Sequence, residues 1–164
     1  ANTTQGEIAM SEDCRPPEPF TRVVQIGIVV KDLDRTIRVL TEVFGMPPFR
    51  VITYPPEDRP DVPRFYHGAP SDYINRQAFA DLGSVELELI QPVRGPSIWE
   101  DFIREHGEGI HHIAFEVKGM ADAVNFLASK GMPLVQAGEY TGGRYAYIDS
   151  TAQLGAILEL LEND

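Results

Sequence analysis

The sequence has little cysteine, few basic residues and no long apolar run. Cys14 is the one cysteine among 164 residues, which excludes a disulfide within the chain and makes a reducing cytoplasm the expected location. Against 25 acidic residues there are only 14 basic ones, and the net charge of −11 disfavours nucleic acid and anionic membranes as partners. No apolar run approaches the roughly 18 residues of a membrane-spanning helix, so none is expected.

The first 19 residues differ in composition from the rest. They are polar, include Pro16, Pro17 and Pro19, and lack the hydrophobic segment of a signal peptide. We expect an N-terminal arm over residues 1–19, either flexible or packed onto a single domain that covers residues 20–164.

Two segments of that domain resemble each other. One runs from Gln25 to Pro47 and the other from His112 to Pro133, and each passes from an apolar stretch through helical spacing to a Gly-Met-Pro sequence. A matching apolar stretch follows each, at 87–90 and at 158–161. A repeat in sequence implies a repeat in structure, so we expect two copies of one module.

The apolar periodicity predicts an α+β fold of two tandem β-α-β-β-β modules, whose strands curl into a mixed sheet around a cleft. Module one covers 20–95, a linking helix 96–108, and module two 109–164. Strands are predicted at 22–30, 49–54, 76–81, 85–91, 110–117, 134–137, 144–149 and 156–161, with helices at 33–44, 97–106 and 120–130. The stretch 55–72 contains five prolines and is predicted to be a long loop or lid.

Two glutamates occupy equivalent places in the repeat. Glu88 and Glu159 each lie between two leucines in the middle of a predicted strand. Simple alternation on a strand with one wet face would also produce this pattern. A carboxylate in an apolar strand is nevertheless costly unless it is paired or bound to a cation, and two at equivalent positions favour a site.

Two further residues align at the first strand of each module. Gln25 and His112 are in register, and a small residue, Gly27 or Ala114, follows each on the same face, where it leaves space for a substrate. Strand parity predicts that the neighbouring His111 points to the opposite face and is packed or exposed.

The donor set suits a metal ion. Together Gln25, Glu88, His112 and Glu159 offer one nitrogen and three oxygens, which fits a divalent ion such as Zn, Ni, Co, Mn or Fe(II). Open positions would remain for water and a substrate oxygen.

These residues and the stretch 107–117, which reads GEGIHHIAFEV, resemble the vicinal oxygen chelate superfamily over about residues 20–162. The superfamily includes glyoxalase I, methylmalonyl-CoA epimerase, bleomycin resistance proteins and extradiol dioxygenases. The stretch 107–117 looks most like the epimerases, whereas the ligand order Gln, Glu, His, Glu is that of zinc-using glyoxalase I. Epimerases of this group carry a further carboxylate near the position of Gln77, where this chain has no acid.

The resemblance implies a metal-dependent isomerase, epimerase or lyase that moves a proton next to a metal-bound carbonyl. Glu159 and Glu88 are the candidate bases, and Arg144, Tyr145 and Tyr147 the candidate substrate-binding residues. A homodimer is also implied. Two alternatives stay open: a non-catalytic small-molecule binding protein of the bleomycin-resistance type, and an Fe(II) extradiol-type dioxygenase, which Gln25 disfavours.

Overall fold

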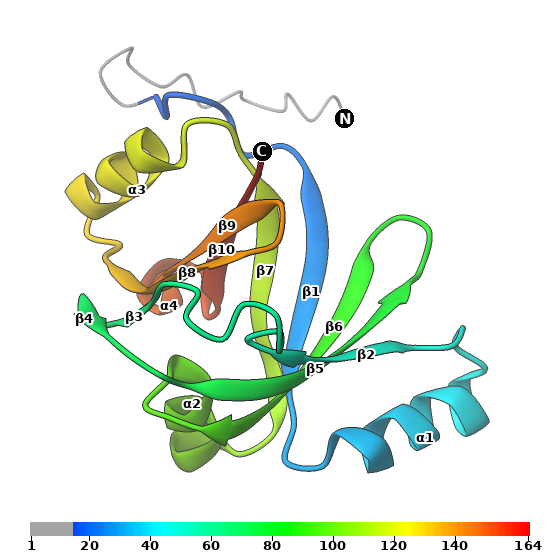
Figure 1. Ribbon diagram of the computed structural model, residues 1–164. Coiled ribbons are helices and arrows are strands. Elements are labelled where there is room, and N and C mark those ends of the chain that lie inside the picture. Colours follow the sequence, from blue (N-terminus) through cyan, green and yellow to red (C-terminus); the bar gives the residue numbers. More distant parts are fainter. Residues whose placement is uncertain (1–14) are drawn as a thin grey trace, which may run out of the picture.

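The computed structural model describes residues 15–164, which form one ten-stranded sheet with helices packed on it (Figure 1). The strand order is β2-β5-β6-β1-β7-β10-β9-β8-β3-β4. Residues 1–14, with Cys14 and most of the predicted arm, lie outside the described residues.

The predicted strands and helices are present in the predicted order with small shifts at their ends, and β3, β4 and α4 are additional to them. The strands are β1 Val23–Val29, β2 Arg50–Tyr54, β3 Arg64–Tyr66, β4 Ala69–Pro70, β5 Ile74–Asp81, β6 Glu86–Arg94, β7 Gly109–Glu116, β8 Leu134–Tyr140, β9 Gly143–Ile148 and β10 Ile157–Asn163. The helices are α1 Leu33–Phe44, α2 Ile98–His106, α3 Met120–Ser129 and the short α4 Thr151–Leu154.

The two similar segments of the sequence form two halves of the sheet with the same strand arrangement. Strand β1 pairs in parallel with β6, and β7 pairs in parallel with β10, so the two halves have the order β2-β5-β6-β1 and β8-β9-β10-β7. The halves meet where β1 and β7 run antiparallel, side by side at the centre of Figure 1. The predicted α+β class with a curled mixed sheet is confirmed.

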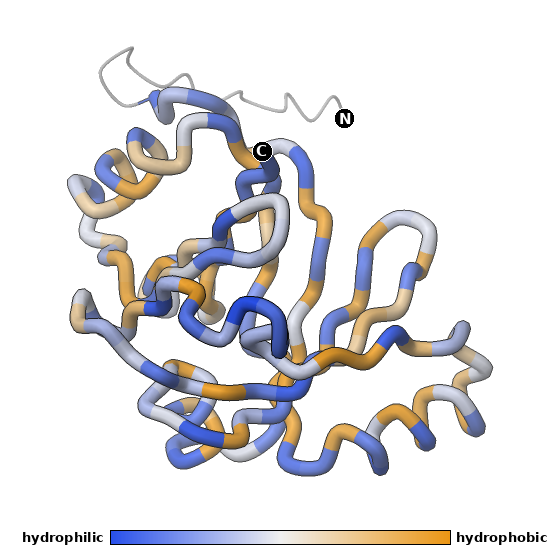
Figure 2. The backbone as a smooth tube through the Cα atoms, in the orientation of Figure 1, coloured by the Kyte–Doolittle hydropathy of each residue, from blue (hydrophilic) through white to orange (hydrophobic). Residues whose placement is uncertain are grey.

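Helices α1 and α3 cover the outer faces of the two halves. Leu89 on β6 lies in a core cluster with Leu33 of α1, and Leu158 on β10 lies in one with Leu127 of α3. The leucines that flank the two glutamates therefore point outward under the helices, and alternation turns the glutamates toward the concave side. Along α1 and α3, apolar and polar residues alternate in Figure 2, as expected for helices with one buried face.

The prediction of a loop at 55–72 is wrong in part. Residues 64–66 and 69–70 form a small hairpin, β3 and β4, and β3 pairs antiparallel with β8 of the other half. The segment thus extends the sheet across the modules. Local sequence could not indicate a three-residue strand whose partner lies about 70 residues further along the chain.

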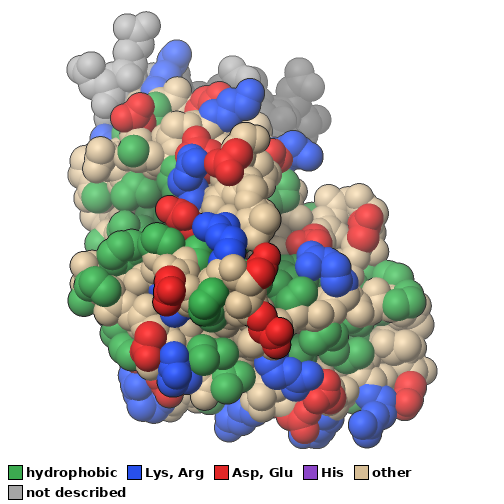
Figure 3. Space-filling model, in the orientation of Figure 1, with side chains coloured by type: hydrophobic (Ala, Val, Ile, Leu, Met, Phe, Trp, Pro, Cys, Tyr) green, Lys and Arg blue, Asp and Glu red, His purple; other side chains and the backbone are tan. Residues whose placement is uncertain are grey.

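The surface is mixed in charge on the face shown in Figure 3, where acidic and basic side chains alternate and no patch of one sign dominates. Within residues 15–164, no helix is both long and apolar enough to cross a membrane.

Helix α1 is capped at both ends. The side chain of Asp32 accepts a hydrogen bond from the Arg35 amide at 2.9 Å, and Gly45 ends the helix in the left-handed conformation with φ of 64°. Both features satisfy backbone groups that a helix leaves unpaired at its ends.

Replacing Asp32 by alanine removes this cap. We expect Asp32→Ala to lower the free energy of unfolding by about 1 kcal/mol in urea titrations, and Asp32→Asn, which can still accept the bond, to stay near the parent. Equal loss in both variants would show that the charge matters and the cap does not.

Candidate metal centre

Three of the four predicted ligands converge on the concave side of the sheet. Glu88 on β6, His112 on β7 and Glu159 on β10 place their donor atoms within 4.8 Å of one another. The Nε2 atom of His112 lies 3.1 Å from an oxygen of each glutamate. All three side chains are buried, so this is a charged cluster withdrawn from solvent.

The ring of His112 lies directly over Gly27 of the neighbouring strand. A Cβ atom built on Gly27 would fall 1.8 Å from the imidazole, because the two residues face each other across β1 and β7. We expected Gly27 to leave room for a substrate, and that is wrong: the space is filled by the imidazole. Glycine here lets the ring reach the two carboxylates.

The cluster fits a cation. His112 hydrogen-bonds to Glu88, but Oε2 of Glu159 has no hydrogen-bond partner although it lies 3.1 Å from the same nitrogen. The hydrogen bond of His112 goes to Glu88, so a buried carboxylate oxygen of Glu159 is left over. A divalent ion would satisfy it, and a set of one imidazole and two carboxylates is suitable for Zn, Mn, Fe(II), Co or Ni.

Protonation is strongly shifted in this cluster. Burial raises the pKa of Glu88 to about 7. Burial alone would lower the pKa of His112, but the neighbouring carboxylates of Glu159 and Glu88 outweigh it and raise that pKa to about 9. Without a cation, the imidazolium is therefore the positive charge that offsets the carboxylates.

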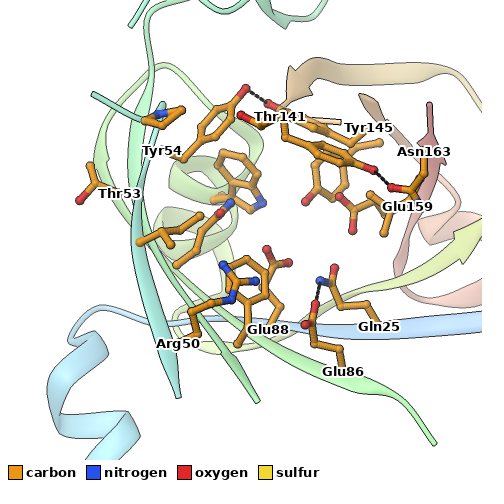
Figure 4. A pocket seen from close by; sticks show the side chains of 18 residues that line it. Gln25, Arg50, Thr53, Tyr54, Glu86, Glu88, Thr141, Tyr145, Glu159 and Asn163 are labelled. Carbon is orange, nitrogen blue, oxygen red and sulfur yellow. Dashed lines mark hydrogen bonds between the residues drawn. The ribbon is translucent and has the colours of Figure 1, made fainter. Parts of the chain in front are cut away.

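The fourth predicted ligand, Gln25, lies beside this cluster in a fixed orientation. Its amide nitrogen donates to Oε1 of Glu86 at 2.9 Å, and the two residues are register partners on β1 and β6 (Figure 4). An ionised carboxylate only accepts hydrogen bonds, so the amide N–H₂ must face Glu86 and the amide oxygen must point away from it. The oxygen is the atom that a metal would require.

The sequence contained a signal for Glu86 that the prediction missed. Glu86 and Glu88 are two residues apart on one strand, and alternation places them on the same face. The second module has no counterpart, because the position equivalent to Glu86 is Ile157.

A β-bulge places His111 beside His112. The register moves from Gly27–His112 to Ile28–Ile110 and skips His111, so parity does not send the two rings to opposite faces as predicted. Their Nδ1 atoms lie 3.0 Å apart, and burial, followed by the charge of His112, lowers the pKa of His111 well below its usual value. A neutral His111 can accept the Nδ1 proton of His112, which leaves Nε2 for the carboxylates or a metal.

The cluster lies at one side of a cavity of about 460 Å³ enclosed by both halves of the sheet. Figure 4 shows Glu88, Glu86 and Gln25 on one side of it and Glu159 and Tyr145 on another. The lining comprises Gln25, Arg50, Ile52, Thr53, Tyr54, Pro56, Gln77, Phe79, Glu86, Glu88, Trp99, Tyr140, Thr141, Tyr145, Tyr147, Glu159, Leu161 and Asn163. The volume is that of a small-molecule site.

Of the three predicted substrate-binding residues, the cavity contains two. Tyr145 and Tyr147 line it, whereas Arg144, between them on β9, is bonded to Glu162 and Asp164 and does not line it. Adjacent strand residues point to opposite faces, so all three could not share the cavity. Burial, and then the charges of Glu159 and Glu88, raise the pKa of Tyr147 well above its usual value and keep its phenol neutral.

A family model described as the glyoxalase/bleomycin resistance protein/dioxygenase superfamily matches residues 24–147. The chain belongs to this superfamily. The resemblance inferred from the sequence is thereby confirmed; the match contains Glu88 and His112 and ends before β10, which carries Glu159.

Solved structures of the superfamily share the fold. Methylmalonyl-CoA epimerase from Mycobacterium tuberculosis has a TM-score of 0.64 at 22% identity over 92% of this chain and 93% of that one. A Streptomyces coelicolor methylmalonyl-CoA epimerase variant in complex with 2-nitronate-propionyl-CoA has a TM-score of 0.60 at 24% identity over 88% and 99%. Identities this low establish the fold only.

A curated relative adds sequence similarity but no activity. The uncharacterized protein YqjC of Bacillus subtilis is 32% identical over 88 residues, which is 52% of this chain and 63% of that protein. The match thus spans less than two thirds of the relative's length.

Substituting Gly27 tests the close approach of His112. We expect Gly27→Ala to push the imidazole away from the carboxylates, to cost about 1–3 kcal/mol in unfolding free energy and to weaken zinc binding. Gly109→Ala is the matched control, since a Cβ atom there meets only Phe102 at an ordinary 3.8 Å. Similar zinc affinities in the two variants would contradict the role given to Gly27.

Metal binding should compete with protons. A metal requires neutral His112 and ionised Glu88, whose pKa values in the metal-free protein are about 9 and about 7. Binding therefore releases protons, and the apparent zinc affinity should rise with pH, by about tenfold per unit between pH 7 and 9, and level off above. Competition titrations with a chelating dye measure this; an affinity independent of pH would contradict it.

Proposed function

We propose that the protein is a metal-dependent enzyme that moves a proton next to a carbonyl group, as an isomerase, epimerase or lyase. The observation that carries the proposal is the buried group of Glu88, His112 and Glu159 at the wall of a small-molecule cavity. Burying a carboxylate lowers the stability of the fold unless a cation or hydrogen bonds compensate its charge. Glu88 and Glu159 both line the cavity, where a substrate can lie.

Glu88, His112 and Glu159 would hold the metal, with the amide oxygen of Gln25 as a fourth donor that Glu86 keeps in place. When bound, a divalent ion polarises a substrate carbonyl and makes the adjacent C–H bond more acidic. The set differs from the two histidines and one carboxylate typical of iron oxygenases, which favours proton transfer over dioxygenase chemistry.

Glu159 is the first choice for the base. Its Oε2 atom has no hydrogen-bond partner among the described residues and would ligate the metal, which leaves the other carboxylate oxygen to take the proton, while Glu88 is bonded to His112. The neutral phenol of Tyr147, its cross-strand partner, can donate a hydrogen bond to negative charge that develops on the substrate. Glu86 also lines the cavity and is the candidate for the second proton-transfer group that epimerisation requires.

The similar proteins indicate which substrates to test first. The fold is shared with methylmalonyl-CoA epimerases and the ligand set resembles that of glyoxalase I, so methylmalonyl-CoA and a glutathione hemithioacetal are the compounds to test first. Both carry an acidic C–H next to a carbonyl or its equivalent.

The test is deuterium exchange. Protein loaded with Zn, Ni, Co, Mn or Fe(II) is incubated with each compound in D₂O, and mass spectrometry follows deuterium at the carbon next to the carbonyl. We expect Glu159→Gln at saturating metal to slow the exchange by at least about 100-fold, because it removes the base. Glu116→Gln, the same change at a half-buried residue of β7 that pairs with Arg22 and does not line the cavity, should leave the rate unchanged.

Metal content is measured on the same samples by elemental analysis, with Glu88→Ala beside the parent protein. About one metal ion per chain in the parent, and little in the variant, would support the site. No metal after incubation with any of these ions would overturn the proposal and favour a binding protein of the bleomycin-resistance type. Full exchange activity in metal-loaded Glu159→Gln would reject Glu159 as the base.

A further inference from the structure

Arg50 is a cavity residue that neither the sequence nor the metal group explains. It begins β2, the edge strand of the first half, and alternation places it on the same face as Ile52 and Tyr54. All three residues line the cavity. Its side chain is labelled in Figure 4 on the side of the cavity that also contains Glu88.

Arg50 lies at the end of a cross-strand row that starts at a proposed metal ligand. Glu88 on β6 is opposite Phe79 on β5, and Phe79 is opposite Arg50 on β2. Two strand spacings separate the backbones of Arg50 and Glu88, which is about 10 Å. The guanidinium lies over Phe79, between the two strands, so a small molecule with two polar ends can reach both it and the carboxylate of Glu88.

The second half contains the equivalent row with a different end. There Glu159 is opposite Tyr147, and Tyr147 is opposite Gln136 on β8. Gln136 is buried and its side-chain oxygen accepts the Ile98 amide at the start of α2, so it has a structural role. Arg50 occupies the corresponding place, where it lines the cavity and is exposed to solvent.

The guanidinium of Arg50 is held but not neutralised. Its central carbon lies 4.5 Å from the centroid of the Phe79 ring, which supports the group by a cation–π contact. Among residues 15–164, no carboxylate lies within ion-pair distance of it, and the nearby Glu86 is engaged with Gln25. A guanidinium that rests on an aromatic face keeps N–H groups for a bidentate anion.

We propose that Arg50 binds a carboxylate or phosphate group of the substrate, so that the substrate carries an anion several atoms from its reacting carbonyl. The inference rests on the proposed function, because the carbonyl end is defined by the metal group. Among the described residues that line the cavity, Arg50 is the one basic side chain, opposed to Glu86, Glu88 and Glu159. Arg50 therefore selects the orientation in which the anionic end lies away from the carboxylates.

Two matched metal-binding ligands test this assignment. Both 4-carboxybenzohydroxamate and 4-carbamoylbenzohydroxamate offer the same hydroxamate to zinc, and they differ only in charge at the far end. We expect zinc-loaded protein to bind the carboxylate at least about tenfold more tightly than the amide in calorimetric titrations, the preference of one charge-assisted hydrogen-bonded pair. In Arg50→Gln the preference should disappear, with binding of the amide unchanged.

The control is Arg35→Gln, which removes the same charge from the exposed face of α1, where Arg35 makes no side-chain ion pair among the described residues. It should keep the preference for the carboxylate. Equal binding of the two ligands by the parent, or a preference that survives in Arg50→Gln, would overturn the role of Arg50 while zinc content still supports the metal site. A parent protein that holds no zinc would overturn the proposed function and this inference together.

Discussion

The structure depends on how two buried carboxylates are compensated. Glu88 and Glu159 lie in strands whose neighbouring leucines pack outward under α1 and α3, so neither glutamate can turn to solvent without removing those leucines from the core. Their negative charge must therefore be compensated by a positive group inside the protein. His112 supplies one positive charge in the metal-free protein, and its pKa of about 9 reports how strongly the carboxylates hold that proton.

The duplicated fold brings these charges together. In each half the first strand pairs in parallel with the last, and the two first strands meet at the centre of the sheet. The ring of His112 from one half therefore lies over Gly27 of the other, between glutamates from both. Any side chain at position 27 would separate the imidazole from its partners, so the close approach of β1 and β7 limits that position to glycine.

The main strands and helices and the two glutamates could be predicted from the sequence, because they depend on local patterns or on the repeat. Apolar periodicity gave the principal strands and helices, and the repeat placed Glu88 and Glu159 at equivalent points. The features that were missed depend on contacts distant in the chain or on local irregularity. The pairing of β3 with β8 is long-range, the bulge at His111 breaks the alternation that parity assumes, and the burial of Gly27 under a ring requires the partner strand to be known.

The differences between the halves carry information that their similarity does not. Equivalent positions hold Glu86 and Ile157 beside the first strands, and Arg50 and Gln136 at the outer strands. If the sheet had only a structural role, an acidic and a basic side chain on one half alone would have no purpose. In the second half both positions serve packing or hold α2, whereas in the first half both side chains line the cavity. The first module is therefore the one in which we expect differences among relatives to change the substrate, since Glu86 and Arg50 line the cavity and neither holds a helix in place.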